Sequence, residues 1–376
     1  MIKIPMLDLA SQYRRLQTEI DGAMGEVMRS AQFINGAPVD DFCNKIADYL
    51  DVKYVIPCGN GTDALRIALM ALKIGSNSEV IVPSFTYIAP VEAVVSVGAT
   101  PISIDVDAET FNINPLLLEK AVTPRTKAII AVHLFGQCAD MEKIINVALK
   151  YNLVIIEDNC QSFGAEYTFG DGRTLKAGAM GQIGVTSFFP TKPLGCYGDG
   201  GAMLTDNEEI AEKMYCLANH GQTKKYHHKI VGFNSRLDTL QAAVLNVKFK
   251  YFNDFTRRRN ELSVRYCKAL RRCSEIILPV VSPFTTHVFH QFTIRVVGGR
   301  RDALRDFLAA NGIQSMIYYP MPVTDQEAYR FAVGISGNLN TTRTICEEVL
   351  SLPIDPEMTD ETQDFIIETV IKFFIQ

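Results

Sequence analysis

The sequence of 376 residues lacks a long basic block and a long apolar run. Its longest basic block is Arg257–Arg259 and its net charge is −5, so a nucleic-acid-binding surface is not indicated. No apolar stretch reaches the roughly 18 residues of a membrane span without prolines or polar breaks. The start, MIKIPMLDLASQY, has no positively charged region followed by an apolar one, as a secretory signal would. We therefore expect a soluble, cytoplasmic protein that binds no membrane.

Paired cysteines are also missing. The nine cysteines are scattered without any C-x-x-C pair, and their number is odd. This pattern is typical of free thiols in a reducing cytosol and argues against a disulfide framework or a zinc site. The hydrophobic content of 47% and the length are sufficient for two domains, or for one large domain with an added lobe.

The first half of the chain alternates between apolar runs and helical patterns. Residues 11–50 have a helical period interrupted by Gly36 and Pro38. Runs this apolar, separated by amphipathic helices, predict parallel strands that are covered on both faces. Ligands of such α/β sheets bind beyond the carboxyl ends of the strands. The predicted strands are 54–58, 79–84, 100–105, 127–135 and 153–158.

Lys192 lies in an uncharged, glycine-rich run, QIGVTSFFPTKPLGCYGDGG (residues 182–201). It is the only charged residue between Lys176 and Asp199. Desolvation disfavours the ammonium form, so more of the side chain would be the neutral amine that attacks carbonyls, as a Schiff-base lysine requires. The alternative is a lysine on a surface loop with its head in water, and the run alone leaves both interpretations open.

The segment SFFPTKPLGCYGDGG resembles the lysine loop of the DegT/DnrJ/StrS-type sugar aminotransferases, which use pyridoxal 5'-phosphate (PLP) on nucleotide-linked keto-sugars. The similarity runs from PMLDLASQY to LSLPIDP and so covers nearly the whole chain. HGQTKKYHHKIVGFNSRLDTLQAA (residues 220–243) is similar to the branch that aminates UDP-2-acetamido-2-deoxy-3-oxo-D-glucuronate. The resemblance implies a fold-type I α/β enzyme, with a mainly parallel sheet in a large domain and a smaller C-terminal α+β domain.

Three residues match positions that hold the cofactor phosphate in this family: Gly61, Thr62 and Ser187. Glycines at a turn before a helix expose backbone N–H groups and the positive end of the helix dipole. Without the resemblance, Gly59-Asn60-Gly61-Thr62 could equally be an ordinary N-capped turn. Tyr87 matches the aromatic residue that stacks on the pyridine ring, and its alternative is a core aromatic.

The predicted strand LVIIED ends at Glu157 and Asp158. By resemblance, Asp158 faces the pyridine nitrogen and keeps it protonated, which makes the ring an electron sink. Gln161 would bond the ring hydroxyl. Paired carboxylates at a strand end can also cap a helix or bind a metal, but no histidine stands at ligand spacing, so we predict no metal site.

Residues 220–236 form the most distinctive polar segment. Asn234 matches a residue that reaches the cofactor phosphate of the other subunit, which implies a homodimer with shared active sites. Arg236 suits the carboxylate or phosphates of a uronate nucleotide; a salt bridge to Asp238 or a contact at a helix N-terminus is the alternative. For His227 and His228 we favour packing in a loop over contact with substrate.

Residues 237–278 contain neither glycine nor proline and keep a helical period, which predicts one long helix leading out of the large domain. We place the boundary between a PLP-binding domain, residues 1–250, and a small C-terminal domain, residues 251–376. In IYYPMPV, Tyr318 replaces the histidine that relatives usually carry, whereas Tyr319 follows the family pattern. Both are predicted substrate-binding residues.

The predicted reaction moves an amino group from L-glutamate to a nucleotide-linked keto-sugar, with Lys192 as Schiff-base lysine and proton shuttle. By resemblance the product enters bacterial surface polysaccharide such as lipopolysaccharide O-antigen. Alternatives within the family are amination of a 4-keto-6-deoxy sugar, and a dehydratase, against which Lys192 argues. Two alternatives lie outside the family. One is a non-catalytic regulator that binds sugar nucleotide. The other is a nicotinamide-dependent oxidoreductase, but the sequence lacks the third glycine of the dinucleotide fingerprint.

Overall fold

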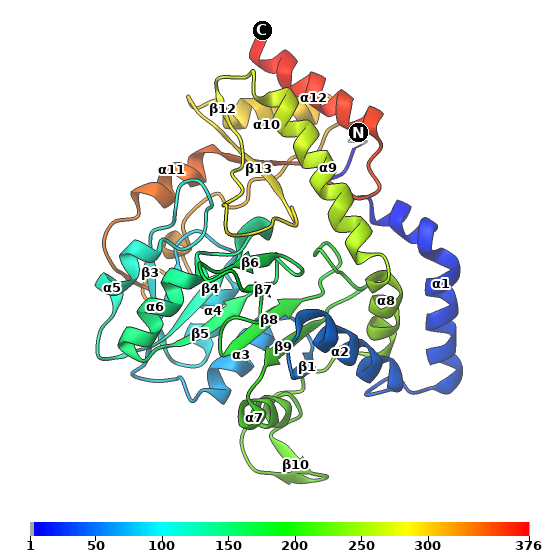
Figure 1. Ribbon diagram of the computed structural model, residues 1–376, viewed down its shortest axis with the longest axis vertical. Helices are drawn as coiled ribbons and strands as arrows, with labels where there is room; N and C mark the ends of the chain where they lie inside the picture. The colour runs from blue at the N-terminus through cyan, green and yellow to red at the C-terminus, as the bar shows by residue number, and fades with distance from the viewer. Residues whose placement is uncertain (1–3, 376) are drawn as a thin grey trace.

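A computed structural model describes residues 4–375 and shows a large mixed sheet wrapped by helices, with a smaller sheet above it (Figure 1). In the eight-stranded sheet only β9 runs antiparallel to its neighbours. The mainly parallel α/β sheet predicted from the apolar runs is confirmed. Its strands, in spatial order, are β1 (Tyr54–Cys58), β9 (Gly201–Thr205), β8 (Ile183–Ser187), β5 (Val154–Asp158), β4 (Thr126–Val132), β2 (Glu79–Pro83), β3 (Thr100–Ile104) and β14 (Gly334–Ile335).

Helices bury both faces of this sheet, which explains why its strands are apolar throughout. Val80 and Val82 of β2 face the core beneath α3 (Gly61–Ala71), α4 (Ala89–Ser96) and α7 (Glu208–Ala218). Ile81, between them, faces the opposite core under α5 (Leu118–Ala121) and α6 (Met141–Tyr151). Since side chains alternate along a strand, a strand covered on both sides has no polar face.

The N-terminal helices close one end of the sheet. Asp8 caps α1 (Leu9–Ser30) by accepting the Ser11 N–H, and α2 (Ala37–Leu50) starts directly after Gly36. Pro38, which was expected to interrupt the helical period, lies in the first turn of α2, where proline is tolerated. Leu16 and Ile20 of α1 pack against α8 (Thr239–Phe249), and α2 packs on both α8 and β1. Among residues 4–375 no helix is long and apolar enough to cross a bilayer.

The predicted single helix over residues 237–278 is wrong, because the chain breaks between α8 and α9 (Phe252–Leu270). Tyr251 leaves helical geometry, with φ −106° and ψ 2°. Lys250 and Tyr251 both bind Glu19 of α1 there, the lysine at 2.8 Å, so a contact with a distant helix ends α8 where the local sequence contains no breaker.

A second, antiparallel sheet follows α9. It contains β12 (Ile276–Ile277), β13 (Phe292–Val296) and β15 (Val349–Leu352), and packs against α9, α10 (Arg301–Ala310) and α12 (Asp360–Ile375). Two segments cross between the halves: Ile4 pairs with Ile313, and β14 extends the large sheet beside β3. The division at residues 250 and 251 stays a prediction.

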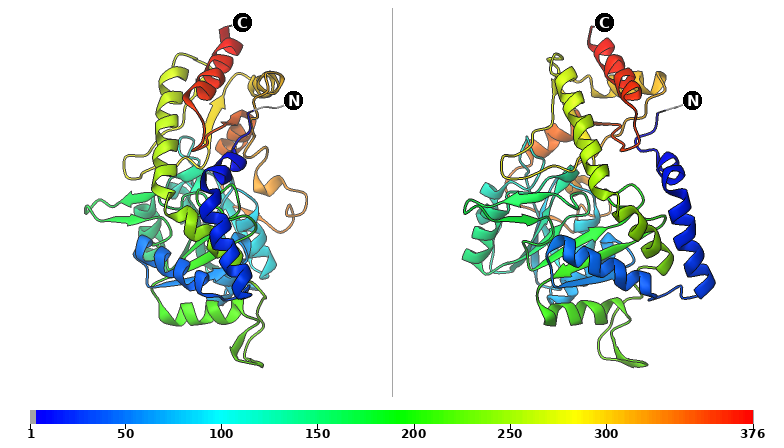
Figure 2. Two further views of the ribbon diagram at one scale, coloured as in Figure 1. Left: turned by 90° about the vertical axis from the view of Figure 1, so that its right-hand side faces the viewer. Right: turned by 45° about the vertical axis from the view of Figure 1, so that its right-hand side comes forward.

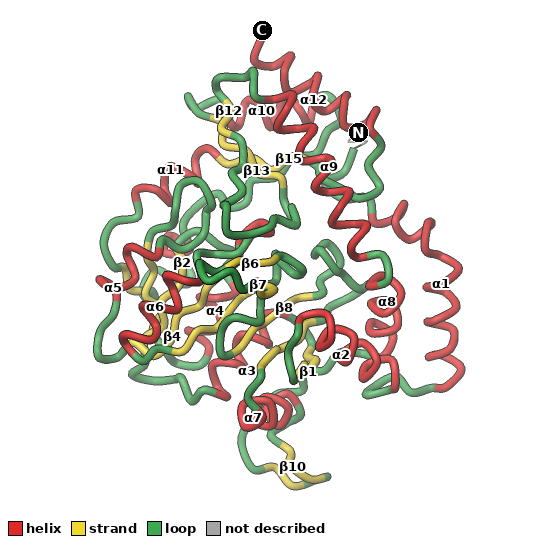
Figure 3. Tube along the Cα trace, viewed as in Figure 1, coloured by secondary structure: helices red, strands yellow, loops and turns green. Residues whose placement is uncertain are grey.

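Two short hairpins and one more helix complete the described chain. The pair β6 (Glu166–Thr168) and β7 (Thr174–Lys176) lies on the large sheet's flank, and α11 (Asn340–Glu348) precedes β15. The hairpin of β10 (Gln222–Lys224) and β11 (His227–His228) projects away from the body next to α7, as all views show (Figure 1, Figure 2 and Figure 3).

Candidate active site

The carboxyl ends of the parallel strands bring predicted site residues together. Asp158 ends β5 and lies opposite Val185 of β8, whose last residue is Ser187. Across β9, strand β1 ends at Cys58 and leads through Asn60 into α3. The turn before α3 therefore lies against the end of β8, as expected for a ligand site at the carboxyl edge of such a sheet.

The first turn of α3 and Ser187 form a cradle with little spare room. A Cβ on Gly61 would lie 2.9 Å from both Cys160 Sγ and Ser187 Cβ, so a larger residue would displace one of them. Asn60 caps the helix by accepting the Asp63 N–H at 2.8 Å, and Gly61 and Thr62 follow as its first residues. The N-capped turn and the predicted phosphate site thus use the same residues, and free N–H groups at a helix start favour an anion.

The charges of Asp158 and Lys192 both act on the thiol of Cys160. Asp158 is buried, and its Oδ1 accepts the Cys160 N–H at 3.0 Å. Burial raises the pKa of Cys160 well above its ordinary value, the Asp158 charge adds to this, and the Lys192 charge opposes it. Both charged groups are therefore within electrostatic reach of one thiol. Lys192 is half-buried, and its N–H donates to Phe189 O at 2.8 Å.

Gln161 has a fixed orientation. Its Oε1 accepts the Phe135 N–H at 2.9 Å, and its Nε2 donates to the Tyr319 hydroxyl at 3.1 Å. Because a backbone N–H can only donate, the amide oxygen must face Phe135 and the amide nitrogen must face the site. One N–H of Nε2 is left for a further acceptor.

Tyr87 lies next to Tyr319, and 56% of its surface is exposed. The alternative of a core aromatic is therefore wrong for this residue. Its ring lies 6.2 Å from that of Tyr319, which also meets Phe85 edge-to-face at 5.9 Å. An exposed ring at this position is free to cover a flat ligand.

Tyr318 and Tyr319 arrive from the second half of the chain and pack against the core of the large sheet. Burial raises the pKa of both phenols above the ordinary value. Both hydroxyls therefore keep their protons at neutral pH and remain hydrogen-bond donors.

Asn234 and Arg236 belong to a separate segment that passes close to the turn before α3, because a Cβ on Gly59 would lie 3.8 Å from Arg236 O. Asn234 is exposed and pairs with Asn219, while the intervening Ser235, which the sequence reading missed, accepts the Gly59 N–H at 2.9 Å and donates to Asp63 at 2.8 Å. In the described chain Arg236 forms no ion pair with Asp238, so the salt bridge is wrong as an alternative, and the contact at a helix N-terminus stays open.

The two histidines of the hairpin are exposed. His228 Nδ1 lies 3.0 Å from His220 O, and His227 belongs to β11. The predicted loop is a short hairpin instead.

A buried histidine missing from the sequence reading lies beside Asp158. His133 Nε2 lies 2.9 Å from Glu157, and its Nδ1 accepts the Ala139 N–H at 3.0 Å, so the expectation that no histidine approaches this carboxylate pair is wrong. Glu157 also accepts N–H groups of Gly178, Met180 and Gly181. The His133–Glu157 pair therefore has a structural role. Both ring nitrogens of His133 are already bonded, and Glu157 holds the loop of residues 178–181. Residues 4–375 contain no cluster of three or more histidine, cysteine, aspartate or glutamate side chains suited to a metal ion.

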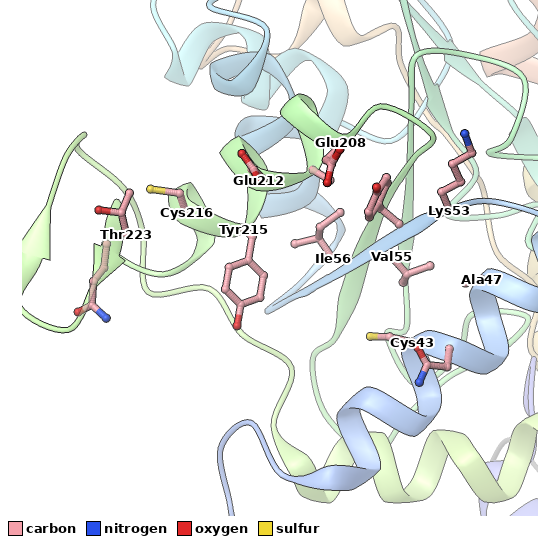
Figure 4. A pocket seen from close by; sticks show the side chains of 14 residues that line it. Cys43, Ala47, Lys53, Val55, Ile56, Glu208, Glu212, Tyr215, Cys216 and Thr223 are labelled. Carbon is pink, nitrogen blue, oxygen red and sulfur yellow. The ribbon is translucent and has the colours of Figure 1, made fainter.

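A cavity of about 670 Å³ lies elsewhere, between α2, the start of β1, α7 and the hairpin (Figure 4). It is lined by Cys43, Tyr54, Glu212 and Tyr215, among others. Tyr54 begins β1 whereas Gly61 follows the end of that strand, so the cavity is at the opposite edge of the sheet from the predicted site.

The comparison with protein families matches residues 14–371 to the DegT/DnrJ/EryC1/StrS aminotransferase family. Relatives include a "pleiotropic regulatory protein" of Geobacillus stearothermophilus, 42% identical and covering 99% of each chain. A UDP-2-acetamido-2-deoxy-3-oxo-D-glucuronate aminotransferase of Pseudomonas aeruginosa is 41% identical over 94% of this chain and 95% of its own. A dTDP-3-amino-3,6-dideoxy-alpha-D-galactopyranose transaminase of Aneurinibacillus thermoaerophilus is 43% identical over 98% and 99%.

Two solved structures share the whole fold. S. venezuelae DesV, in complex with a ketimine intermediate, superposes with a TM-score of 0.94 at 39% identity and full coverage of both chains. The ntda protein of Bacillus subtilis, with bound cofactor PMP, gives a TM-score of 0.91 at 33% identity and covers all of this chain and 86% of its own.

Proposed function

Given that this chain belongs to the DegT/DnrJ/EryC1/StrS aminotransferase family, we propose that it transfers the amino group of L-glutamate to UDP-2-acetamido-2-deoxy-3-oxo-D-glucuronate. The coarser activity, PLP-dependent amination of a nucleotide sugar, comes with the family and its transaminase relatives. The observation that carries the finer proposal is Arg236, a guanidinium without an ion pair to Asp238, in a segment that Ser235 fastens beside the cofactor cradle.

The residues present fit pyridoxal phosphate. A Cβ at Gly61 would fill the cradle, and the N–H groups of the first turn of α3 and the Ser187 hydroxyl are suitable donors to a phosphate dianion. Asp158 is a buried carboxylate with one oxygen bound to Cys160 N. We assign it to the protonated ring nitrogen, and Gln161 Nε2 to the ring oxygen.

Pyridoxal phosphate, when bound, carries the amino group from donor to acceptor and supplies an electron-withdrawing ring. Lys192 would hold the cofactor between turnovers and, once released, its amine would take the proton from the donor's α-carbon and deliver it to the cofactor carbon that carries the nitrogen. Asp158 keeps the ring nitrogen protonated. Tyr87 covers one face of the site and excludes water there.

For the sugar, we assign the carboxylate to Arg236, which can bind it with two parallel hydrogen bonds. Tyr318 and Tyr319 keep their protons and serve as donors to sugar oxygens. Tyr319 already accepts from Gln161 Nε2, so its own hydrogen points to another acceptor. We further propose a homodimer in which Asn234 serves the partner's cofactor phosphate. Bacterial surface polysaccharide, such as O-antigen, is the proposed destination of the product.

A pair of substrates tests the uronate assignment. Arg236→Met is expected to raise KM for the 3-oxo-glucuronate nucleotide by roughly 10- to 100-fold, because a charge-assisted bidentate bond is lost. The matched control is UDP-N-acetyl-3-dehydro-α-D-glucosamine, the neutral sugar in the name of another relative, whose KM should stay unchanged. Equal losses on both substrates, or no amination of the uronate by the unmodified protein, would refute this substrate.

A second candidate follows from the relative named a pleiotropic regulatory protein. A regulator on this fold would bind the nucleotide sugar without turnover. Glutamate-dependent formation of amino-sugar by the purified protein separates the two, and the Lys192→Ala protein is the matched inactive control. A chain that binds the nucleotide and forms no product under these conditions would support the regulator.

A further inference from the structure

A tight turn at residues 134–137 touches the cofactor site and both halves of the chain. Its central residues, Phe135 with φ 58° and Gly136 with φ 124°, both adopt positive φ. That conformation is unfavourable for phenylalanine, so surrounding contacts must hold the turn. A Cβ on Gly136 would lie 2.8 Å from Phe289 N, because the segment 287–291 packs directly on it.

Asn112 binds the turn at both ends. Its side chain is 3% exposed; Oδ1 accepts the Leu134 N–H at 2.8 Å and Nδ2 donates to Gln137 O at 3.3 Å. The preceding residue, Phe111, packs its ring edge-to-face on Phe135 with centroids 5.5 Å apart. One short stretch therefore fixes the first, second and last residues of the turn.

The 134–137 turn determines which end of the Gln161 amide faces the site. Phe135 N–H donates to Gln161 Oε1 at 2.9 Å, which leaves Nε2 to donate to Tyr319 and to one more acceptor. Without that N–H, nothing here prevents the amide from rotating by half a turn. Its oxygen would then face an electron-rich ring oxygen, and a hydrogen bond would become a repulsion.

The contacts on the outer side of the turn do not replace this restraint. Val288 N donates to Gly136 O at 2.8 Å and Gln291 N donates to Phe135 O at 3.2 Å. Both bind carbonyls in the middle of the turn. Asn112 instead binds Leu134, whose N–H precedes the peptide unit that sets the direction of Phe135 N–H.

We propose that Asn112 is a positioning residue of the cofactor site, which holds the 134–137 turn so that Phe135 N–H keeps the Gln161 amide in its donor orientation. This inference rests on the proposed contact between Gln161 and the cofactor. Asn112 itself touches neither cofactor nor substrate. Its effect must therefore pass through Gln161.

Titration of the apoprotein with pyridoxal phosphate, followed by visible absorbance, measures this effect without any sugar substrate. Asn112→Ala should weaken cofactor binding roughly 5- to 10-fold, the worth of one hydrogen bond. It should also move the pH midpoint of the visible band in the same direction as Gln161→Ala. The matched control is Asn114→Ala. Asn114 lies two residues further along the same loop, and its Oδ1 accepts the N–H of Leu116 and makes no bond to the 134–137 turn. Its affinity and band should match those of the unmodified protein.

The double variant decides whether the effect passes through Gln161. In the Gln161→Ala background, Asn112→Ala should cause no further loss of cofactor affinity. An unchanged affinity in Asn112→Ala, or the same loss with and without Gln161, would overturn the proposal. If Asn112→Ala does not fold, the nearly isosteric Asn112→Leu, which loses both bonds to the turn, carries the same comparison. A failure to aminate the proposed sugar would refute the substrate and leave this result standing.

Discussion

The cofactor side and the sugar side of the site are built differently. Gly61, Asp158 and Ser187 stand at the ends of buried elements, where sheet register brings them together. Within residues 220–236 the hairpin of β10 and β11 projects from the body, and the segment leaves apolar side chains in solvent, with Tyr226 80% and Val231 86% exposed. The fold of a single chain therefore fixes the positions of Gly61, Asp158 and Ser187. Exposed apolar residues on a projecting hairpin fit contact with another molecule, in line with the proposed homodimer.

Two adjacent carboxylates give the largest expected contrast on the cofactor side. Asp158→Asn should lower kcat by roughly 10²- to 10³-fold, because the ring nitrogen loses its charged partner, with little change in stability. Glu157→Gln should instead destabilise the fold by roughly 2 kcal/mol, because Glu157 accepts three backbone N–H groups. Steady-state rates and urea unfolding separate the two. An unchanged kcat in the Asp158→Asn protein would show that Asp158 takes no part in the reaction.

A buried cation beneath the lysine loop gives the next largest effect. Burial, helped by the charge of Arg259, lowers the pKa of Lys248 from 10.5 to about 8. Between these values the unfolded chain holds one more proton than the folded one, so stability should rise with pH across this window. Lys248→Met should abolish that rise and stabilise the protein at pH 7 by roughly 3 kcal/mol.

Urea unfolding at pH 7, 8.5 and 10 measures this rise in stability. The matched control is Lys213→Met, on the exposed side of α7, which should retain the rise. A Lys248→Met protein whose stability still climbs between pH 8 and 10 would show that another group titrates there.

The cradle is tested by adding a single methyl group. Gly61→Ala places a Cβ 2.9 Å from Cys160 Sγ and Ser187 Cβ, and should weaken pyridoxal phosphate binding about 10-fold. Gly22→Ala, in α1, meets nothing within 4 Å and serves as control. Cofactor titration of the two apoproteins gives the comparison, and equal affinities would mean that the phosphate lies elsewhere.

The sugar side is tested by mixing subunits. Co-expressed Lys192→Ala and Asn234→Ala chains should form mixed dimers with one intact site each, so the mixture regains about a quarter of the normal number of sites. Each variant alone is the control. A mixture no more active than the mean of the two separate proteins would show that Asn234 serves its own chain.

Most of the fold and the cofactor side could be predicted from the sequence. The apolar runs became β1 to β5 because parallel strands need apolar residues on both faces. Gly61 and Asp158 were singled out because strand ends are visible in the pattern, whereas Ser187 came from the family resemblance alone, and the roles of all three stay predictions. Strands β8, β9 and β14 escaped, because pairing with a distant strand decides such elements.

What the sequence could not show depends on contacts between distant segments. The break after α8 follows from Glu19, which lies more than two hundred residues away. His133 reaches Glu157 from the neighbouring strand, and Ser235 reaches Gly59 across the fold. Polar residues such as Asn112 resemble ordinary loop residues until the turn that they hold is known.

The central claim is that Lys192, and not the more buried Lys248, carries the cofactor. The direct measurement is reduction of the holoprotein with borohydride, followed by peptide mass spectrometry. The pyridoxal adduct should appear on the peptide that contains Lys192, and the Lys192→Ala protein should yield none. An adduct on Lys248, or an unmodified Lys192 after complete loss of the visible band, would contradict the account.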